Sequence, residues 1–270
     1  MRHYCTITDS NYLLRFLALY ESMRYCQPFT LWTLVLDDRT AQKLEEMNLP
    51  GVTAVPLSVI VDDRLMQAKS NRSRIEFIWT LKASFMQAIL RDELGADSIA
   101  HVDADMLFFS NPTPAFTEIG SAPVAVAPHR YSPRCAPRGT TPGVYNGGFV
   151  YVARAGMDFL DWWAAACIEW CYWHHDAGRY VDQKYLDDAP ERWGAHALKH
   201  KGAHLGPWNQ EQYGYSLRDG QIFVDDDPLL WYHFHKGLEP GFVLCPFVEK
   251  CIYGDYREAL EHAEWRMDKL

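Results

Sequence analysis

The segment SIAHVDADMLFF (residues 98–109) decides how this chain is interpreted. Its apolar run up to Val102 is typical of a buried strand, and Asp103 and Asp105 follow where that strand ends. In open α/β sheets, ligands collect at the carboxyl ends of the strands. Because neighbouring carboxylates repel each other, the pair predicts a divalent cation such as Mn²⁺ or Mg²⁺. A solvated acidic turn or a helix cap is the simpler alternative.

Strand-like and helix-like runs alternate on both sides of this segment, which predicts a mainly parallel α/β sheet. Ile75–Leu90 is the clearest helix, and Lys82 lies near its apolar stripe. We expect strands at Tyr4–Thr8, Thr30–Leu36, Val52–Pro56, Ser98–Val102, Val124–Ala127, Gly148–Val152, Ile222–Val224 and Leu230–Phe234. Further helices are expected at Leu13–Met23, Thr40–Met47, Met157–Trp173 and Tyr256–Leu270.

The composition is that of a globular protein, with 270 residues, 48% hydrophobic residues and a net charge of −9. The acidic balance argues against nucleic acid or an anionic membrane as the main partner. The sequence contains no run of about 18 uncharged apolar residues, so we expect no transmembrane segment. The polar residues at 9–11 are not typical of a signal peptide, and seven scattered cysteines favour reduced thiols in the cytoplasm.

The stretch HVDADMLFFSNP (residues 101–112) resembles the D-x-D segment of GT-A glycosyltransferases. The glycosyltransferase family 8 type, with glycogenins and bacterial lipopolysaccharide galactosyltransferases, is the most similar. The resemblance extends as separate islands from residue 4 to about residue 240. It implies a single GT-A (Rossmann-like) domain over residues 1–270, with a mixed, mostly parallel central sheet flanked by helices. Residues 1–110 would be the nucleotide-sugar-binding half and residues 111–270 the acceptor-side half.

The same resemblance implies an enzyme, a hexosyltransferase that uses Mn²⁺ or Mg²⁺. It would move a sugar from a nucleotide-sugar, a UDP-sugar above all, to a saccharide or other hydroxyl acceptor, with retention of anomeric configuration. Asp103 and Asp105 would hold the metal, which would neutralise charge on the departing diphosphate. Ala104 would lie between them against the donor.

A late histidine completes the metal sphere in the resembled family. In WYHFHKGLEPGF (residues 231–242), His233 and His235 alternate along a predicted strand and therefore point the same way. His233 matches the family best, and His235 is the near-equal rival. Lys236 could reach the diphosphate, but it stands where the family commonly has a glycine. The later K-P-W signature is replaced by Glu-Pro-Gly at 239–241.

Further donor contacts are implied by YCTITDSNY (residues 4–12), which resembles the opening strand and loop where the base and ribose lie. Thr6, Thr8, Asp9 and Tyr12 would then touch the donor. The alternative is that Asp9 or the next residue only caps the following helix. In FIWTLKASF (residues 77–85), Lys82 would point at the diphosphate or donor sugar, or it could snorkel to solvent.

Two later islands carry the candidate catalytic residues. In GVYNGGFVYVARAG (residues 143–156), Asn146 would face the donor sugar, and the two glycines after it permit close backbone approach or form a tight turn. In GRYVDQKYL (residues 178–186), Asp182 would bind sugar hydroxyls, and Gln183 would lie opposite the leaving diphosphate. Asp182 could instead be a helix N-cap. Trp208 and Asn209 could bind a sugar ring.

The stretch 128–143 is rich in proline and arginine and is predicted to be a loop. Arg130, Arg134 and Arg138 could close over the donor or bind an acidic acceptor, unless the loop is simply solvated surface. Two alternative functions stay open. One is a phosphohydrolase that uses the D-x-D as nucleophile and acid, and the other is a non-catalytic binder of nucleotides or carbohydrates.

Overall fold

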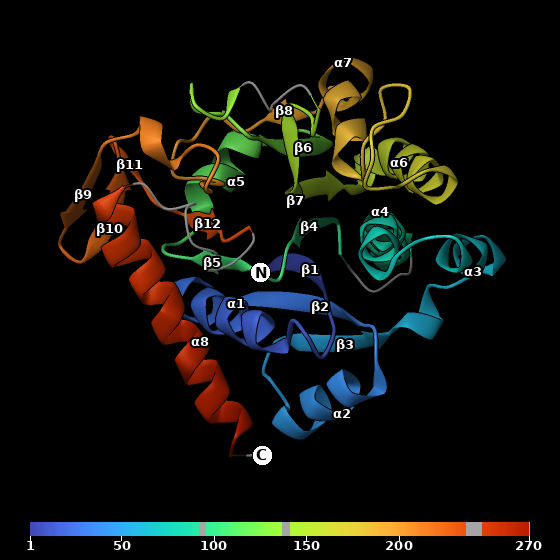
Figure 1. Cartoon of the computed structure of the whole chain (residues 1–270), viewed down its shortest axis with the longest axis horizontal. Coiled ribbons are helices and arrows are strands. Elements are labelled where there is room, and N and C mark those ends of the chain that lie inside the picture. The colour runs from blue at the N-terminus through green and yellow to red at the C-terminus, as the bar shows by residue number, and fades with distance from the viewer. Residues whose placement is uncertain (92–95, 137–140, 236–244, 270) are drawn as a thin grey trace.

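The computed structural model describes residues 1–91, 96–136, 141–235 and 245–269. In this part of the chain the largest element is a seven-stranded sheet of order β3-β2-β1-β4-β7-β6-β8 (Figure 1). Its strands come from both halves of the chain: β1 (Arg2–Thr8), β2 (Phe29–Val35), β3 (Val52–Pro56), β4 (Ser98–Val102), β6 (Val124–Pro128), β7 (Tyr145–Ala153) and β8 (His196–Ala197).

Strands β3, β2, β1 and β4 run parallel, and β6 and β8 run parallel to each other. Only β7 is antiparallel to both of its neighbours, β4 and β6. The prediction of a mixed, mostly parallel sheet is therefore confirmed. Two small antiparallel sheets flank it: β5 (Met106–Phe108) with β12 (Trp231–His233), and β9 (Tyr215–Arg218) with β10 (Gln221–Val224) and β11 (Asp227–Pro228).

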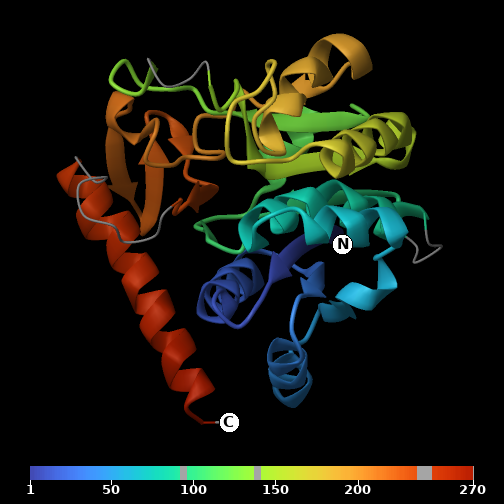
Figure 2. The same ribbon diagram turned by 45° about the vertical axis from the view of Figure 1, so that its right-hand side comes forward.

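Helices cover both faces of the central sheet (Figures 1 and 2). One core joins a face of the sheet to α1 (Leu13–Cys26), α5 (Thr113–Ile119) and α8 (Tyr253–Met267), with α2 (Asp38–Met47) at its edge. A second core joins the other face to α3 (Asp63–Ser70), α4 (Arg74–Arg91), α6 (Met157–Glu169) and α7 (Ala189–Trp193). A third core packs the start of α8 against β10 and β12.

Helix α4 shows why these cores form. Phe77, Leu81, Phe85 and Ile89 are buried and follow one another at intervals of four residues, so they make one apolar stripe. Burying a side chain of this kind stabilises the fold by about 1.5–3 kcal/mol. Lys82 comes directly after Leu81 and is also buried, which places a cation inside the molecule.

The expected helix Met157–Trp173 ends earlier, at Glu169, because Trp170 takes an extended conformation. The segment 146–148 is not a tight turn as weighed from the sequence. It lies within β7, where the pairing with β6 shifts register between Val126 and Ala127. Such a bulge turns side chains away from the regular alternation of a strand. Helices α3 and α5 and strands β5 and β9 were not expected, because they are short and only weakly periodic.

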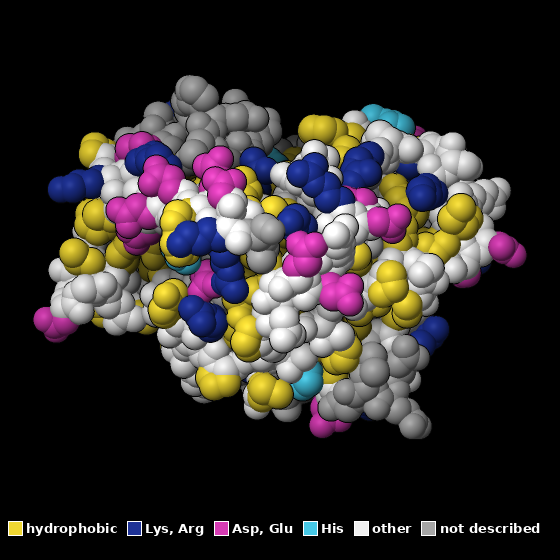
Figure 3. Space-filling model, turned by 90° about the horizontal axis from the view of Figure 1, so that it is seen from below, with side chains coloured by type: hydrophobic (Ala, Val, Ile, Leu, Met, Phe, Trp, Pro, Cys, Tyr) yellow, Lys and Arg dark blue, Asp and Glu magenta, His cyan; other side chains and the backbone are white. Residues whose placement is uncertain are grey.

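On the face of the molecule in Figure 3, basic side chains lie between acidic ones rather than in a separate basic area. This mixture agrees with a sequence in which 35 acidic residues accompany 26 basic ones. Within the described ranges, no helix combines the length and the apolar character that crossing a membrane requires.

Candidate metal and donor site

Asp103 and Asp105 lie in the short connection between β4 and β5. The Asp103 N–H donates to the Gly148 carbonyl of β7 (3.1 Å), and the Asp105 carbonyl accepts from the Phe234 N–H (2.9 Å). Because β5 pairs with β12, His233 stands opposite Met106, next to the acidic pair. The backbone of two sheets therefore brings a late histidine to an acidic turn 128 residues earlier, counted from Asp105.

The side chains of this group converge. His233 Nε2 is 3.1 Å from Asp105 Oδ1 and 3.7 Å from Asp103 Oδ2. One ligand atom from each of the three residues lies within 4.8 Å of the others. Two carboxylate oxygens and an imidazole nitrogen are a donor set that suits Mn²⁺, and also Mg²⁺ completed by water or phosphate. The residues therefore fit the metal that the sequence predicts.

His233 rather than His235 belongs to this group. His233 is buried, whereas His235 is exposed and its ring centre lies 6.0 Å from that of His233. Burial lowers the pKa of His233, but the carboxylates of Asp105 and Asp103 outweigh it, and the net pKa is raised. A divalent cation would replace the proton that the two acids now favour on this imidazole.

A glycine makes room for the imidazole. A Cβ atom on Gly148 would lie 2.6 Å from His233 Cε1 and Nδ1, which is closer than van der Waals contact allows. The His233 ring is thus packed directly on the backbone of β7. Trp208 meets the ring edge-on from another side, with ring centres 5.4 Å apart.

Lys82 joins two carboxylates in the interior. Its Nζ lies 2.9 Å from Asp103 Oδ1 and 3.4 Å from Asp182 Oδ2, and it donates to the Gly147 carbonyl (3.1 Å). Burial lowers the pKa of Lys82, but Asp103 and Asp182 outweigh it and raise the pKa above the ordinary value. Lys82 is 5% exposed, so the alternative that it snorkels to solvent is wrong.

Burial and neighbouring charges also act in opposite directions on the pKa of Asp103. Burial raises the pKa of its carboxyl, but Lys82, His101 and His233 outweigh this and hold the pKa well below its usual range. For Asp105, burial again raises the pKa, and His233 lowers it further than burial raises it. Both groups are therefore carboxylates at neutral pH, as metal ligands must be.

Asp182 precedes a 3₁₀ helix, η4 (Gln183–Asp188), but its side chain makes no capping hydrogen bond. Asp182 therefore occupies the N-cap position that the sequence suggested, but its carboxylate faces Lys82 and does not cap the helix. Burial raises the pKa of Asp182, and Lys82 only partly offsets it. Gln183 reaches the same place, since its Oε1 accepts from the Gly147 N–H (3.3 Å) and its Nε2 donates to the Pro142 carbonyl (2.8 Å).

Asn146 is held at both ends of its amide. Its Oδ1 accepts from the Gly148 N–H (2.7 Å), and its Nδ2 lies 3.0 Å from His129 Nε2. His129 Nδ1 contacts the Val144 carbonyl (3.2 Å), so the Nδ1–H tautomer satisfies both contacts. Burial lowers the pKa of His129 to about 3, which keeps Nε2 free to accept. A contact of Asn146 with a donor sugar stays a prediction.

Asp9 follows β1, the strand beside β4. Its Oδ1 accepts from the N–H groups of Asn11 (2.9 Å) and Tyr12 (3.1 Å), and its Oδ2 accepts from Arg74 Nε (2.9 Å). Tyr12, rather than Asp9, is the N-cap residue of α1, so Asp9 holds the turn that leads into the helix. Thr6 and Thr8 are buried in β1. The donor contacts expected of these residues stay predictions.

Ala104 is buried between its acidic neighbours. Lys236 and Arg138 lie outside the described residues. Arg130 does not face an acceptor, because its buried guanidinium donates to carbonyls of the loop 198–203. Asn209 is also a structural residue, since it is fully buried and binds the Gly206 N–H and the His129 carbonyl. The sugar-binding role considered for Asn209 is therefore wrong.

Two neighbours of the site were missed by sequence reasoning. His101 Nε2 lies 2.9 Å from Asp103 Oδ1, and the two residues alternate along one extended segment, a signal that could have been used. Arg74 contacts Asp9 from the first turn of α4, and no feature of the sequence indicates that pairing.

Comparison with known proteins extends these observations. No family model matches the chain. It is 33% identical over 261 residues to the uncharacterized protein YfnD of Bacillus subtilis (strain 168), covering 94% of this chain and 82% of YfnD. It superposes on the galactosyltransferase LgtC, crystallised with donor and acceptor sugar analogues, with a TM-score of 0.62 and 15% identity, over 98% and 99% of the two chains.

Mouse xyloside xylosyltransferase 1 superposes with a TM-score of 0.56 and 14% identity, over 86% of this chain and 96% of that one. At such low identity these superpositions establish the fold. The resemblance to GT-A enzymes that the D-x-D segment suggested is thereby confirmed at the level of architecture. The chain has the GT-A glycosyltransferase fold and belongs to the same family as Bacillus subtilis YfnD.

Proposed function

We propose that this protein is a metal-dependent glycosyltransferase that moves a sugar from a UDP-sugar to a hydroxyl acceptor, with retention of anomeric configuration. The convergence of Asp103, Asp105 and His233 within 4.8 Å carries the proposal. These residues lie at the carboxyl end of β4, where α/β sheets bind their ligands. The proteins that superpose over nearly their whole length are glycosyltransferases by name.

In this proposal Asp103, Asp105 and His233 hold Mn²⁺, with Mg²⁺ as the alternative. The bound ion supplies Lewis-acid stabilisation of the leaving diphosphate. Lys82 holds the pKa of Asp103 low and partly offsets the effect of burial on the pKa of Asp182. It also orients both carboxylates, because it contacts them from inside the protein. A rigid arrangement of this kind positions the donor at little entropic cost when the reaction begins.

Asp182, Gln183 and Asn146 are the residues we assign to the sugar side. All three meet the backbone of β7 around Gly147 and Gly148, either directly or through Lys82. A Cβ atom on Gly147 would lie 2.8 Å from Asp182 Oδ2, so Asp182 packs closely on this backbone. The acceptor hydroxyl is the nucleophile, and its proton passes to the departing phosphate.

A thermal-shift panel tests the proposal. UDP, GDP, CDP and ADP are each added with Mn²⁺ or with EDTA, to the wild type and to Asp105→Ala. A ligand at about 100 times its Kd adds roughly 2.7 kcal/mol of stability, or about 5–10 °C for a chain of this size. We expect UDP to stabilise the wild type only with Mn²⁺, and Asp105→Ala to lose the effect. No shift with any nucleotide would contradict the proposal.

The same protein separates the alternative functions. Incubation with Mn²⁺ and UDP-sugars, followed by detection of released UDP, distinguishes a transferase from a protein that only binds nucleotides. An acid-stable mass increase of one phosphoryl group on Asp103 would instead identify a phosphohydrolase. That role is disfavoured because Lys82 and His101 already occupy Asp103 Oδ1.

We retain two further proposals. Residues 1–270 form one GT-A domain, supported by a sheet whose strands come from both halves. The protein works in the cytoplasm, supported by its seven cysteines, each in a described range and each a free thiol.

A further inference from the structure

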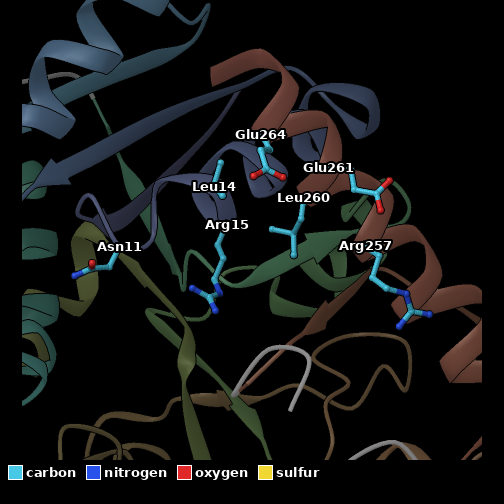
Figure 4. A pocket seen from close by; sticks show the side chains of 7 residues that line it. All are labelled: Asn11, Leu14, Arg15, Arg257, Leu260, Glu261 and Glu264. Carbon is cyan, nitrogen blue, oxygen red and sulfur yellow. The ribbon is translucent and has the colours of Figure 1, made fainter. Parts of the chain in front are cut away.

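A groove of about 370 Å³ lies between the start of α1 and the exposed side of α8 (Figure 4). Arg15 enters it from α1, and Arg257 and Glu261 enter it from α8. The Arg15 guanidinium lies over the ring of Tyr12, 4.6 Å from the ring centre. One face of the guanidinium is therefore covered by an aromatic ring, and its N–H groups lie in the plane at its edge.

The charge of Arg15 has no partner in the described part of the chain. None of the ion pairs found there includes Arg15, whereas Arg257 in the same groove binds Glu249 at 2.9 Å. Arg15 also lies in the first turn of α1, which has no acidic residue. A cation at that end of a helix is disfavoured by the helix dipole unless an anion is bound nearby.

Helix α1 packs along β5, which begins directly after Asp105: Ala18 shares a core with Leu107, and Ser22 Oγ accepts from the Phe108 N–H. Arg15 precedes Ala18 by one turn and therefore lies toward the Asp105 end of β5.

Burial raises the pKa of Tyr12, and the nearby carboxylates of Asp105 and Asp103 raise it further, while Arg15 lowers it. Behind Arg15, the ring of Tyr256 stacks on that of Phe234 with centres 3.8 Å apart. Phe234 in turn donates its N–H to the Asp105 carbonyl. The Tyr256–Phe234 stack thus connects the start of α8 to the backbone of Asp105.

The net charge of the proposed donor complex leaves a need for such a cation. The carboxylates of Asp103 and Asp105 balance a divalent ion, and Lys82 balances Asp182. The diphosphate of a nucleotide-sugar then brings a negative charge on each phosphate. Arginine suits this task because its planar fork binds phosphate oxygens with two parallel hydrogen bonds.

We propose that Arg15 binds the donor diphosphate from the α1 side, opposite the metal. This inference rests on the proposed function and adds a phosphate-binding residue to it. The stack on Tyr12 holds the guanidinium in place before the ligand arrives, so less side-chain entropy is lost on binding.

Calorimetric titration of the full chain with Mn²⁺ tests the role of Arg15. The ligands are UDP, UMP, uridine and inorganic pyrophosphate, and the variants are Arg15→Met, Arg15→Lys and Arg257→Met. We expect Arg15→Met to weaken UDP and pyrophosphate binding by about 10- to 100-fold, the effect of losing charge-assisted hydrogen bonds. Uridine binding should not change, and Arg15→Lys should recover part of the loss. Arg257→Met is the matched control and should bind UDP within about twofold of the wild type.

The outcomes separate this inference from the proposed function. Unchanged UDP affinity in Arg15→Met would overturn the inference alone. An equal loss for UDP and uridine would also overturn it, because Arg15 would then only support the Tyr12 ring. If the wild type binds pyrophosphate but not UDP, Arg15 is still tested by pyrophosphate, and only the uridine assignment fails. If the wild type binds neither ligand, the proposed function fails and this inference fails with it. Thermal unfolding of each variant without ligand shows whether it is folded.

Discussion

Asp9 and the Asp103–Asp105 pair follow neighbouring strands, β1 and β4, at the same edge of one sheet. The two acidic turns have different partners. Asp9 is saturated by two backbone N–H groups and by Arg74. Among the ion pairs of the described residues, Asp105 has His233 as its partner, whereas Asp103 contacts His101 and His233 and shares Lys82 with a third acid. The protein thus completes the coordination of the Asp9 carboxylate and leaves that of Asp105 less complete, so a cation would be expected at the β4 turn.

Exposure follows the same division. Asp9 has a side chain that is 4% exposed and closed by protein atoms, whereas the side chain of Asp103 is 24% exposed. The pair at β4 also concentrates negative charge, because Asp182 lies on the far side of Lys82. A site with surplus carboxylates and partial access to solvent is suited to a cation from solution.

The largest expected effect on stability follows from removing Lys82, which lies beside the acidic turn after β4. Lys82→Met leaves Asp103 and Asp182 buried without their shared cation, and we expect a loss of about 3–5 kcal/mol in the free energy of unfolding. Urea denaturation at neutral pH measures it. Lys43→Met is the control, since its pair with Glu46 is at the surface and should contribute far less to stability. Equal losses in the two variants would contradict this account.

Neutralising Asp105 should affect the function more than the fold. Asp105→Asn keeps the shape but removes a charged metal ligand, so we expect Mn²⁺-dependent sugar transfer to fall by about 10²–10³-fold. Stopped-time assays of UDP release measure the rate. Asp226→Asn, at a fully exposed acid, should match the wild type. A fully active Asp105→Asn enzyme would show that this carboxylate is no ligand.

Removing the Asp9 carboxylate should lower the stability of the fold and leave metal binding unchanged. Asp9→Ala removes the acceptor of two backbone N–H groups, and we expect about 1–3 kcal/mol of lost stability. Arg74→Met should cost less, about 1 kcal/mol or below, because its side chain is 56% exposed. In both variants the affinity for Mn²⁺ should be unchanged. Weaker Mn²⁺ binding, measured by titration, would mean that the two acidic turns act as one site.

The smallest expected effect is a pH dependence of folding stability, which the titration of His233 causes at the acidic turn after β4. The pKa of His233 is raised in the fold, so without metal its contribution to stability is complete below about pH 6.5 and is lost as pH rises through the raised pKa. Mn²⁺ competes with that proton, so stabilisation by Mn²⁺ should grow over the same rise. Thermal unfolding from pH 5 to 9, with and without Mn²⁺, measures both trends.

His233→Gln should flatten both trends, because the titrating group is gone. The lowered pKa values of Asp103 and Asp105 act elsewhere: their contribution is complete above the ordinary carboxyl pKa and is lost only in strong acid, as pH falls through the lowered values. A Mn²⁺ effect that does not vary between pH 5 and 9 would exclude His233 as a ligand.

Much of the fold could be predicted because its elements have strong local patterns. Strands β3 and β4 begin and end where the apolar runs do, and α4 has a regular apolar stripe. The reversed direction of β7 has no local signal, since it depends on pairing with two distant strands. Helix α5 was missed for a similar reason, because seven residues are too few for a clear period.

The part of the site that could be predicted consists of residues that are close together in the sequence. Asp103 and Asp105 are two residues apart, and their relation could be inferred from sequence alone. The partners supplied by distant segments could not: Arg74 for Asp9, and the amide of Asn146 bonded to His129. These pairings fix the orientation of Asp9 and Asn146, which the sequence alone does not indicate.

Because Gly148 has no side chain, the residue at this position decides whether the His233 ring has room beside β7. Any larger residue there would displace the His233 ring, which a Cβ would approach to 2.6 Å. If the proposed metal is bound, a relative could therefore retain both aspartates and the histidine and still lose the metal through one substitution at this glycine. Among divergent members of the family, the residue at this position should indicate retained metal dependence better than the D-x-D motif does.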